Sequence, residues 1–250
     1  MKYQIYNIIQ TEYNGRQNTK WMEWNMKQCN DRERWIHQNM AVIGGFMGGY
    51  AILNHHELFG SAQTANMISI AMDAAGRLDA DFAVRVLGLL VYMAGLASTV
   101  ILPKLNLNLK LFSVCLDAAA LVLVGLLPDD LNDFIALYPL FFASSVQWCS
   151  FKGADGFVSA SIFSTNNLRQ FTTSFTEYIC SRDREALRKG KFYGKVLLFF
   201  HSGVAAAFLS CQAFGLKGAW VGIVPVCTAF AQVCIDCYGG ACETEELAAQ

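Results

Sequence analysis

The chain has 250 residues, of which 54% are apolar and 16% are charged, and its mean hydropathy is +0.31. Soluble domains usually carry about 25% charged residues, and the formal net charge of −1 provides no basic surface of the kind that binds nucleic acid. The sequence also lacks the glycine-rich phosphate-binding, nucleophile-elbow and HExxH motifs. We therefore expect no enzyme activity, no cofactor, no metal site and no nucleic-acid partner.

The charges are collected in short stretches between apolar runs, and several runs reach the roughly 20 residues that a helix needs to cross a bilayer. The breaks between runs carry helix-ending residues such as Pro103, Pro128 and the glycines of the 152–156 turn. The sequence predicts an all-α integral membrane protein, a helical bundle of eight membrane segments. In chain order these segments lie at 35–54, 60–76, 82–102, 109–127, 131–152, 157–180, 192–214 and 218–238.

Two polar tails flank the predicted bundle. Residues 1–34 are polar with mixed charge, and no apolar stretch follows Met1, so we expect a cytoplasmic N-terminal tail and not a cleaved signal peptide. The acidic residues 239–250 are expected to form a frayed C-terminal tail. Between the tails, the bundle divides into a first membrane repeat at 35–127 and a second at 131–238.

Lysine and arginine predict the orientation, because cytoplasmic loops of membrane proteins are enriched in them. Of the 19 such residues, six lie in the first 34 residues and six lie between 182 and 195. Both termini are therefore expected in the cytoplasm, and the protein in the plasma (inner) membrane if it is bacterial. Eight spans place 14 basic residues inside and four outside, whereas six spans, with 60–76 and 157–180 re-entrant, place 15 inside and three outside. Both arrangements stay open, and external labelling of a cysteine at Asp79 would distinguish them.

The two halves of the chain are alike in sequence. Residues 59–67 align with 160–168 at an offset of 101, and residues 81–87 align with 191–197 at an offset of 110. Two positions of the first alignment carry identical residues, namely Thr64 with Thr165 and Asn66 with Asn167. The alignment predicts a two-fold internal repeat, inverted if there are six spans and parallel if there are eight. Many transport folds are built from such repeats, with the site at the repeat interface.

Polar side chains inside a membrane segment need partners, because an unpaired polar group in hydrocarbon costs several kcal/mol. Segment 157–180 is rich in hydroxyl and amide groups, so we expect it to face other helices, water or a ligand. Arg169 lies within this segment, where it favours an anionic ligand or pairs with Glu177. Asp117 lies in an apolar segment and is a candidate for carrying a coupling proton. The residues predicted to contact a solute are Gln63, Thr64, Asn66, Thr165, Asn166, Asn167 and Arg169.

These residues resemble the YoaK-type DUF1275 family of polytopic membrane proteins, over roughly residues 36 to 238. That family carries a Thr-Gly-Asn motif in each half, the first preceded by a Gly-Phe-containing helix and the second by a Gln-containing helix. The resemblance implies a permease-like protein and adds Gln147 to the predicted site. The chain departs from the pattern at three positions: the central glycines are Ala65 and Asn166, and Gly48 replaces the acidic residue usual after the Gly-Phe pair.

Simpler explanations exist for each feature. Threonine and asparagine in membrane helices often only join neighbouring helices through hydrogen bonds. Gly44, Gly45, Gly48 and Gly49 fit close helix packing, and Arg169 fits a surface ion pair. The sequence favours a secondary transporter or permease-like protein for a small polar or anionic solute, with the lipid bilayer and that solute as its partners. The alternative is a non-transporting ligand-binding or scaffold protein that acts through the basic 182–195 loop. The oligomeric state stays open.

Overall fold

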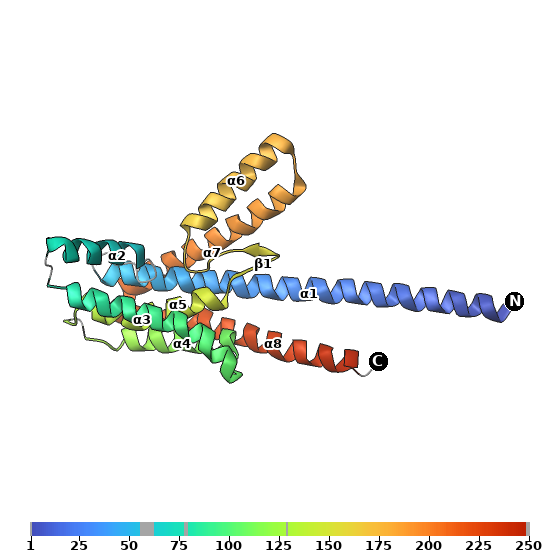
Figure 1. The fold of residues 1–250 in the computed structure, drawn as a ribbon, viewed down its shortest axis with the longest axis horizontal. Coiled ribbons are helices and arrows are strands. Elements are labelled where there is room, and N and C mark those ends of the chain that lie inside the picture. The colour runs from blue at the N-terminus through green and yellow to red at the C-terminus, as the bar shows by residue number, and fades with distance from the viewer. Residues whose placement is uncertain (1, 56–62, 78–79, 129, 249–250) are drawn as a thin grey trace.

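The computed structural model describes residues 2–55, 63–77, 80–128 and 130–248, and the side chains from 28 to 237 within those ranges. These residues are almost entirely helical, which confirms the all-α fold (Figure 1). In chain order the helices are α1 (Lys2–Asn54), α2 (Gln63–Met72), α3 (Phe82–Ile101), α4 (Leu109–Val124), α5 (Asp133–Ser150), α6 (Thr165–Ser181), α7 (Arg184–Phe214) and α8 (Ile223–Ala248). Short π and 3-10 turns cover Asp73–Arg77, Leu102–Leu105 and Gly215–Gly222.

Some element boundaries differ from those that the sequence predicts. Helix α1 begins at Lys2 and not at residue 35, and α8 continues to Ala248 through the expected frayed tail. The segment predicted as a helix over 157–180 is helical only from Thr165, because the preceding residues form a two-residue antiparallel hairpin, β1 (Gly153–Ala154) and β2 (Phe157–Val158), and an irregular stretch. Asp79 and residues 60–62 lie outside the described residues.

Helices α1, α3, α4, α5, α7 and α8 form the bundle (Figure 1). Helix α1 runs parallel to α7 and α3 runs parallel to α5, whereas α4 runs antiparallel to α5 and α8. Helix α1 packs along α7, α3 packs along α5, and α4 packs against both α5 and α8. At one end of the bundle His55 Nδ1 lies 2.9 Å from Asp133 Oδ1, which joins the end of α1 to the start of α5. We call this the loop end. At the opposite end, the tail end, the N-terminal half of α1 and the last turns of α8 extend beyond the other helices.

Helix α6 does not join the bundle. It packs on the first half of α7, and the two form a helical hairpin that projects sideways (Figure 1). The phenyl rings of Phe171 and Phe175 lie against Gly194 and Gly190 of α7. The exposed threonine hydroxyls of α6 donate to carbonyl oxygens of the preceding turn, as Thr176 does to Thr172 at 2.9 Å. This helix therefore carries fewer unpaired polar groups than its sequence indicates.

The β1–β2 hairpin fastens the tail end of the bundle to α1. Asp155 lies at its turn with a positive φ of 60° and accepts two hydrogen bonds from the Arg34 guanidinium, at 2.9 and 2.8 Å. The hydrogen bonds that Arg34 donates to the Asp155 carboxylate raise the pKa of Arg34 above its usual value. Because the pair is bidentate, it fixes both the distance and the orientation of the hairpin relative to α1.

Helices α1 and α7 approach each other at glycines, as the spacing of the glycines in α1 predicts. A Cβ atom on Gly45 would overlap the carbonyl oxygen of Phe200, and a Cβ on Gly203 would overlap the carbonyl oxygen of Val42. The contact is therefore reciprocal, with a glycine of each helix against the backbone of the other. On a different face of α1, Gly44 lies against the carbonyl oxygen of Ser161, which precedes α6.

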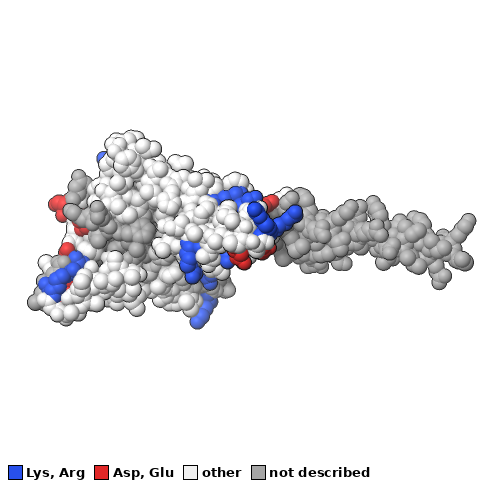
Figure 2. All heavy atoms as spheres, turned by 90° about the horizontal axis from the view of Figure 1, so that it is seen from above, with Lys and Arg blue, Asp and Glu red and all other residues white. Residues whose placement is uncertain are grey.

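Two stretches are long and apolar enough to cross a membrane. The most apolar 18-residue windows of Phe82–Leu105 and Arg184–Cys237 have mean hydropathies of 2.0 and 1.8, yet only 17% and 33% of these windows are buried inside the structure. The core helices of a soluble protein would be mostly buried. Large apolar side chains such as Leu90, Met93 and Val100 of α3 are more than half exposed. Figure 2 shows Lys and Arg mainly toward the tail end of the body, with a largely charge-free stretch before the loop end.

The reciprocal glycine contact yields a stability prediction. Gly45→Ala places a methyl group where the Phe200 carbonyl lies, so the two helices must separate, and overpacking of this kind costs about 1–3 kcal/mol. We expect a lower apparent melting temperature in detergent for this variant. Ala205→Leu, on the exposed face of α7, is the control and should leave it unchanged. Equal melting temperatures for the wild type and Gly45→Ala would contradict the close contact.

Candidate functional site

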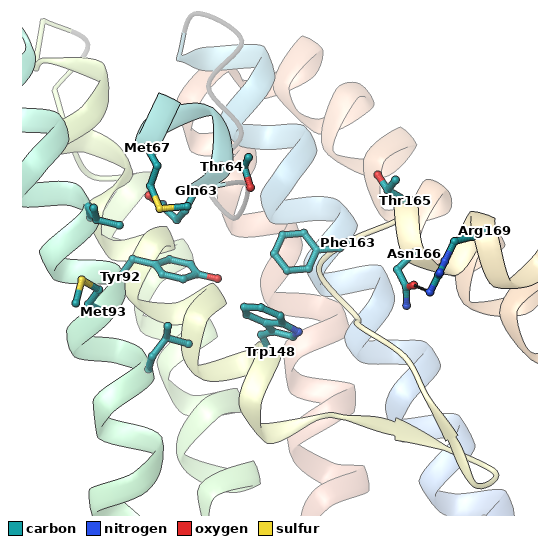
Figure 3. A pocket seen from close by; sticks show the side chains of 12 residues that line it. Gln63, Thr64, Met67, Tyr92, Met93, Trp148, Phe163, Thr165, Asn166 and Arg169 are labelled. Atoms are coloured by element: carbon teal, nitrogen blue, oxygen red, sulfur yellow. Dashed lines mark hydrogen bonds between the residues drawn. The ribbon is translucent and has the colours of Figure 1, made fainter. Parts of the chain in front are cut away.

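A cavity of about 810 Å³ lies between α2, α3, the end of α5 and the start of α6 (Figure 3). Its volume falls within the roughly 300–1,000 Å³ that is typical of small-molecule sites. Gln63 and Thr64 line it from the first turn of α2, and Thr165 and Asn166 line it from the first turn of α6. The structure therefore brings parts of the two predicted motifs, 101 residues apart, to one cavity.

Both of these helices begin at the cavity, and this determines its electrostatics. The first turn of a helix exposes peptide N–H groups and carries a partial positive charge. At the start of α6, the N-cap residue Ser164 makes no side-chain hydrogen bond to the first turn. Peptide donors of α6 are therefore not capped by that side chain, and they lie beside the cavity-lining Thr165 and Asn166. An arrangement of this kind attracts an anionic or electron-rich group.

Arg169 lines the cavity one turn further along α6. Its side chain is exposed, and its Nη2 donates to Asn166 Oδ1 at 3.0 Å. The partner is thus the neighbouring amide of the motif and not Glu177, which the sequence offered as the alternative. Among the described residues no acidic side chain pairs with the guanidinium, and Arg169 is the one charged residue of that part of the chain that lines the cavity.

The rest of the lining is apolar and was not predicted from the sequence. Tyr92 and Met93 of α3, Met67 of α2, Trp148 of α5 and Phe163 contribute most of it. Trp148 and Phe163 meet edge to face, with ring centroids 5.1 Å apart, and Figure 3 shows the Tyr92 ring directed toward them. Sequence reasoning missed these residues because an aromatic side chain or methionine in an apolar helix has the same pattern whether it faces lipid, core or cavity.

Three of the predicted residues lie elsewhere. Asn167 is buried, where its amide donates to the carbonyl oxygens of Ala160 and Phe163 at 2.8 and 2.9 Å and accepts from Ser159 at 3.0 Å. Asn66 Nδ2 donates to Gln63 Oε1 at 3.2 Å. Both asparagines therefore bond within their own segment, and of the residues that are identical in the two motifs only the threonines, Thr64 and Thr165, line the cavity.

Gln147 is fully buried between helices and does not line the cavity. Its Nε2 donates to the Met40 carbonyl oxygen of α1 at 2.8 Å and to Ser161 Oγ at 3.0 Å. These bonds join α5, α1 and the segment that leads into α6. Gln147 therefore positions the start of α6 from outside the cavity.

Asp117 lies in the middle of α4, fully buried and away from the cavity. Neither of its carboxylate oxygens has a hydrogen-bond partner among the described residues, and the same holds for the hydroxyl of Ser113, one turn earlier. A buried ionised carboxylate without a partner is very costly, so the neutral acid is the form that such surroundings accommodate.

No metal-binding group is evident in the part of the chain that the structure describes, where no cluster of three or more His, Cys, Asp and Glu side chains could hold an ion. His55 pairs with Asp133, and Cys237 accepts a hydrogen bond from Asn108 at 3.1 Å. The side chains of His56 and Cys242 lie outside the described residues.

Fold and surface define a helical protein with two stretches able to cross a membrane and a cavity at the starts of two short helices. A family described as protein of unknown function (DUF1275) matches residues 37–232. Because this match covers most of the chain, the protein belongs to the DUF1275 family, as its motifs indicated. No curated protein and no solved structure matches the chain.

The two neighbouring asparagines of α6 yield a matched pair of variants. Asn167→Leu should destabilise the protein, because it leaves buried carbonyl groups and the Ser159 hydroxyl unpaired, at about 1–3 kcal/mol for a lost buried partner. Asn166→Leu changes an exposed side chain that lines the cavity and should leave the apparent melting temperature nearly unchanged. If Asn166→Leu proves the more destabilising of the two, the assignment of structural and cavity roles is wrong.

Proposed function

We propose that the protein is a multi-pass, permease-like membrane protein of the YoaK type with six spans. Helices α1, α3, α4, α5, α7 and α8 would cross the bilayer. Helix α2 has 10 residues, which corresponds to about 15 Å, or half the thickness of a bilayer core. Helix α6 projects from the bundle and does not run along it. The exposed apolar faces of α3 and α7 support this arrangement, because lipid would cover them.

The positions of the basic residues support a cytoplasmic tail end. With six spans, 15 of the 19 Lys and Arg residues fall on the side of the two termini and three on the other. Those three, Arg77, Arg85 and Lys217, belong to segments at the loop end. The bias follows the positive-inside rule.

We further propose an inverted two-fold repeat that pairs α1 with α5, α2 with α6, α3 with α7 and α4 with α8. The packing of the helices supports it, because the contact of α1 with α7 has its counterpart in that of α5 with α3. Likewise α4 packs on α5 as α8 packs on α1, and α2 packs on α3 as α6 packs on α7. In the bundle, the two members of each pair run in opposite directions (Figure 1).

The function that this arrangement supports best is secondary transport of a small polar or anionic solute. One observation carries the proposal: the first turns of α2 and α6, which correspond in the repeat, line the same cavity. Secondary transporters commonly place their site at a repeat interface, where the N-termini of short helices face an anionic group of the substrate. Asp117, buried without a partner among the described residues, would carry the coupling proton.

A second candidate function follows from the α6–α7 hairpin. It projects from the bundle, and its basic residues Arg182, Arg184, Lys191 and Lys195 are exposed. A non-transporting protein could use this surface to bind a partner. In that case neutralising these four residues would abolish the cellular function, while substitutions at the cavity would not.

The number of spans can be tested at the two ends of α3. In a background without the nine native cysteines, Ala80→Cys at the loop end should react with a membrane-impermeant maleimide added to intact cells. Asn106→Cys, exposed at the tail end, should react only after permeabilisation. An eight-span arrangement predicts the opposite pattern at both positions, so that result would overturn the six-span proposal.

The role of Asp117 can be tested in proteoliposomes loaded with a pH-sensitive dye and challenged with a panel of amino acids, sugars and carboxylates. We expect at least one solute of this panel to cause a change of the internal pH in proteoliposomes that contain the wild-type protein. Asp117→Asn keeps the shape of the side chain but cannot ionise, so proton movement should be lost. Ser113→Ala, on the same buried face of α4, is the matched control and should retain it. Coupling that survives Asp117→Asn would exclude this carboxylate as the proton carrier.

A further inference from the structure

The cavity has a polar side and an apolar side, and this division indicates which chemical class of ligand fits it. The α6 side presents Arg169, Asn166 and the uncapped first turn. The other side is formed by Tyr92, Trp148 and Phe163 together with methionines and leucines of α2 and α3. In Figure 3 the rings of Trp148 and Phe163 stand between the α3 residues and the polar residues of α6.

The charge inside the cavity allows a single compensating anionic group. Arg169 is the one charged residue among the described lining residues, and its hydrogen-bond partner there is the neutral amide of Asn166. One guanidinium and one helix start suit a carboxylate, since Arg binds planar carboxylates through two parallel hydrogen bonds. A multiply charged ligand would find no second cation among the described lining residues.

The apolar side requires that the ligand have an apolar body. An inorganic anion or a sugar would offer no apolar surface to the rings of Tyr92, Trp148 and Phe163, and burial of apolar surface is favourable in proportion to its area. Aromatic rings prefer offset or edge-to-face neighbours, and the existing 89° contact of Trp148 with Phe163 leaves ring faces and edges available for another ring.

We propose that this cavity binds a small organic monocarboxylate with an aromatic or branched apolar body. Its carboxylate lies against Arg169, Asn166 and the start of α6, and its apolar body lies between Tyr92, Trp148 and Phe163. The inference rests on the proposed function only in taking this cavity as the solute site, and the ligand class follows from the lining itself.

The test is direct binding to the full-length protein in lipid nanodiscs, measured by calorimetry with three matched probes. Phenylacetate carries both the charge and the ring, phenylacetamide keeps the ring without the charge, and acetate keeps the charge without the ring. We expect phenylacetate to bind at least about tenfold more tightly than either of the others, because each lacks one of the two contacts. Equal affinities for phenylacetate and acetate, equal affinities for phenylacetate and its amide, or no binding of phenylacetate would each overturn the proposal.

Two variants test whether phenylacetate binds at Arg169. Arg169→Gln should lower the affinity for phenylacetate to that of phenylacetamide, whereas Arg184→Gln, at the distal end of the same helical hairpin, should leave it unchanged. Both side chains are exposed, so both variants should fold. Unchanged affinity in Arg169→Gln would overturn the assigned site, as would a co-purified phospholipid that phenylacetate does not displace.

Flux measurements separate this inference from the transport proposal. Binding with the expected dependence on Arg169, but without uptake of radiolabelled phenylacetate into proteoliposomes, would support the ligand class and count against transport. Uptake of other solutes in the panel without binding of phenylacetate would support transport and overturn the ligand class.

Discussion

The close contact of α1 with α7 determines where the rest of the candidate site lies. Gly45 and Gly203 let each helix touch the backbone of the other, and α7 in turn carries α6. Gln147 adds a second constraint, because its amide donates both to the Met40 carbonyl oxygen of α1 and to the hydroxyl of Ser161, which lies between the β1–β2 hairpin and α6. The start of α6 is thus fixed from two directions. The position of the polar side of the cavity therefore depends on contacts between helices, and the residues that make these contacts do not themselves line the cavity.

The surrounding medium is the next constraint. The apolar windows of α3 and of α7–α8 are mostly exposed, and exposed side chains of this kind require an apolar neighbour. In the membrane arrangement that we propose, lipid would satisfy that requirement for α3, α7 and α8 and would leave the backbone of each helix internally hydrogen-bonded. The threonines of α6 likewise satisfy their polar groups within their own helix. Their hydroxyls donate to carbonyl oxygens of that helix, which leaves their methyl groups on the surface. A polar sequence can therefore present a moderately apolar face.

The sequence predicted the class of the fold and the location of the motifs better than it predicted what each side chain does. Segment lengths and helix-ending residues located the helices, and the aligned threonines marked the starts of α2 and α6. The asparagines of the same motifs could not be assigned, since an amide next to a helix start can bind a ligand or its own loop, and Asn167 binds its loop. The aromatic side of the cavity could not be predicted either, because it combines residues from helices whose packing no local pattern encodes.

The two halves of the chain differ where a symmetric site would be expected. The residue that corresponds to Arg169 in the first half is Ile68, which is exposed and apolar. Gln63 corresponds to Ser164, so the first half places an amide where the second half has an uncapped helix start. A strictly symmetric pair of motifs would suit a symmetric ligand or an ion on the axis. With a cation on one side and apolar rings on the other, the cavity that we propose as the solute site would distinguish the two ends of a ligand, so that a solute with one charged and one apolar end would occupy it in one orientation.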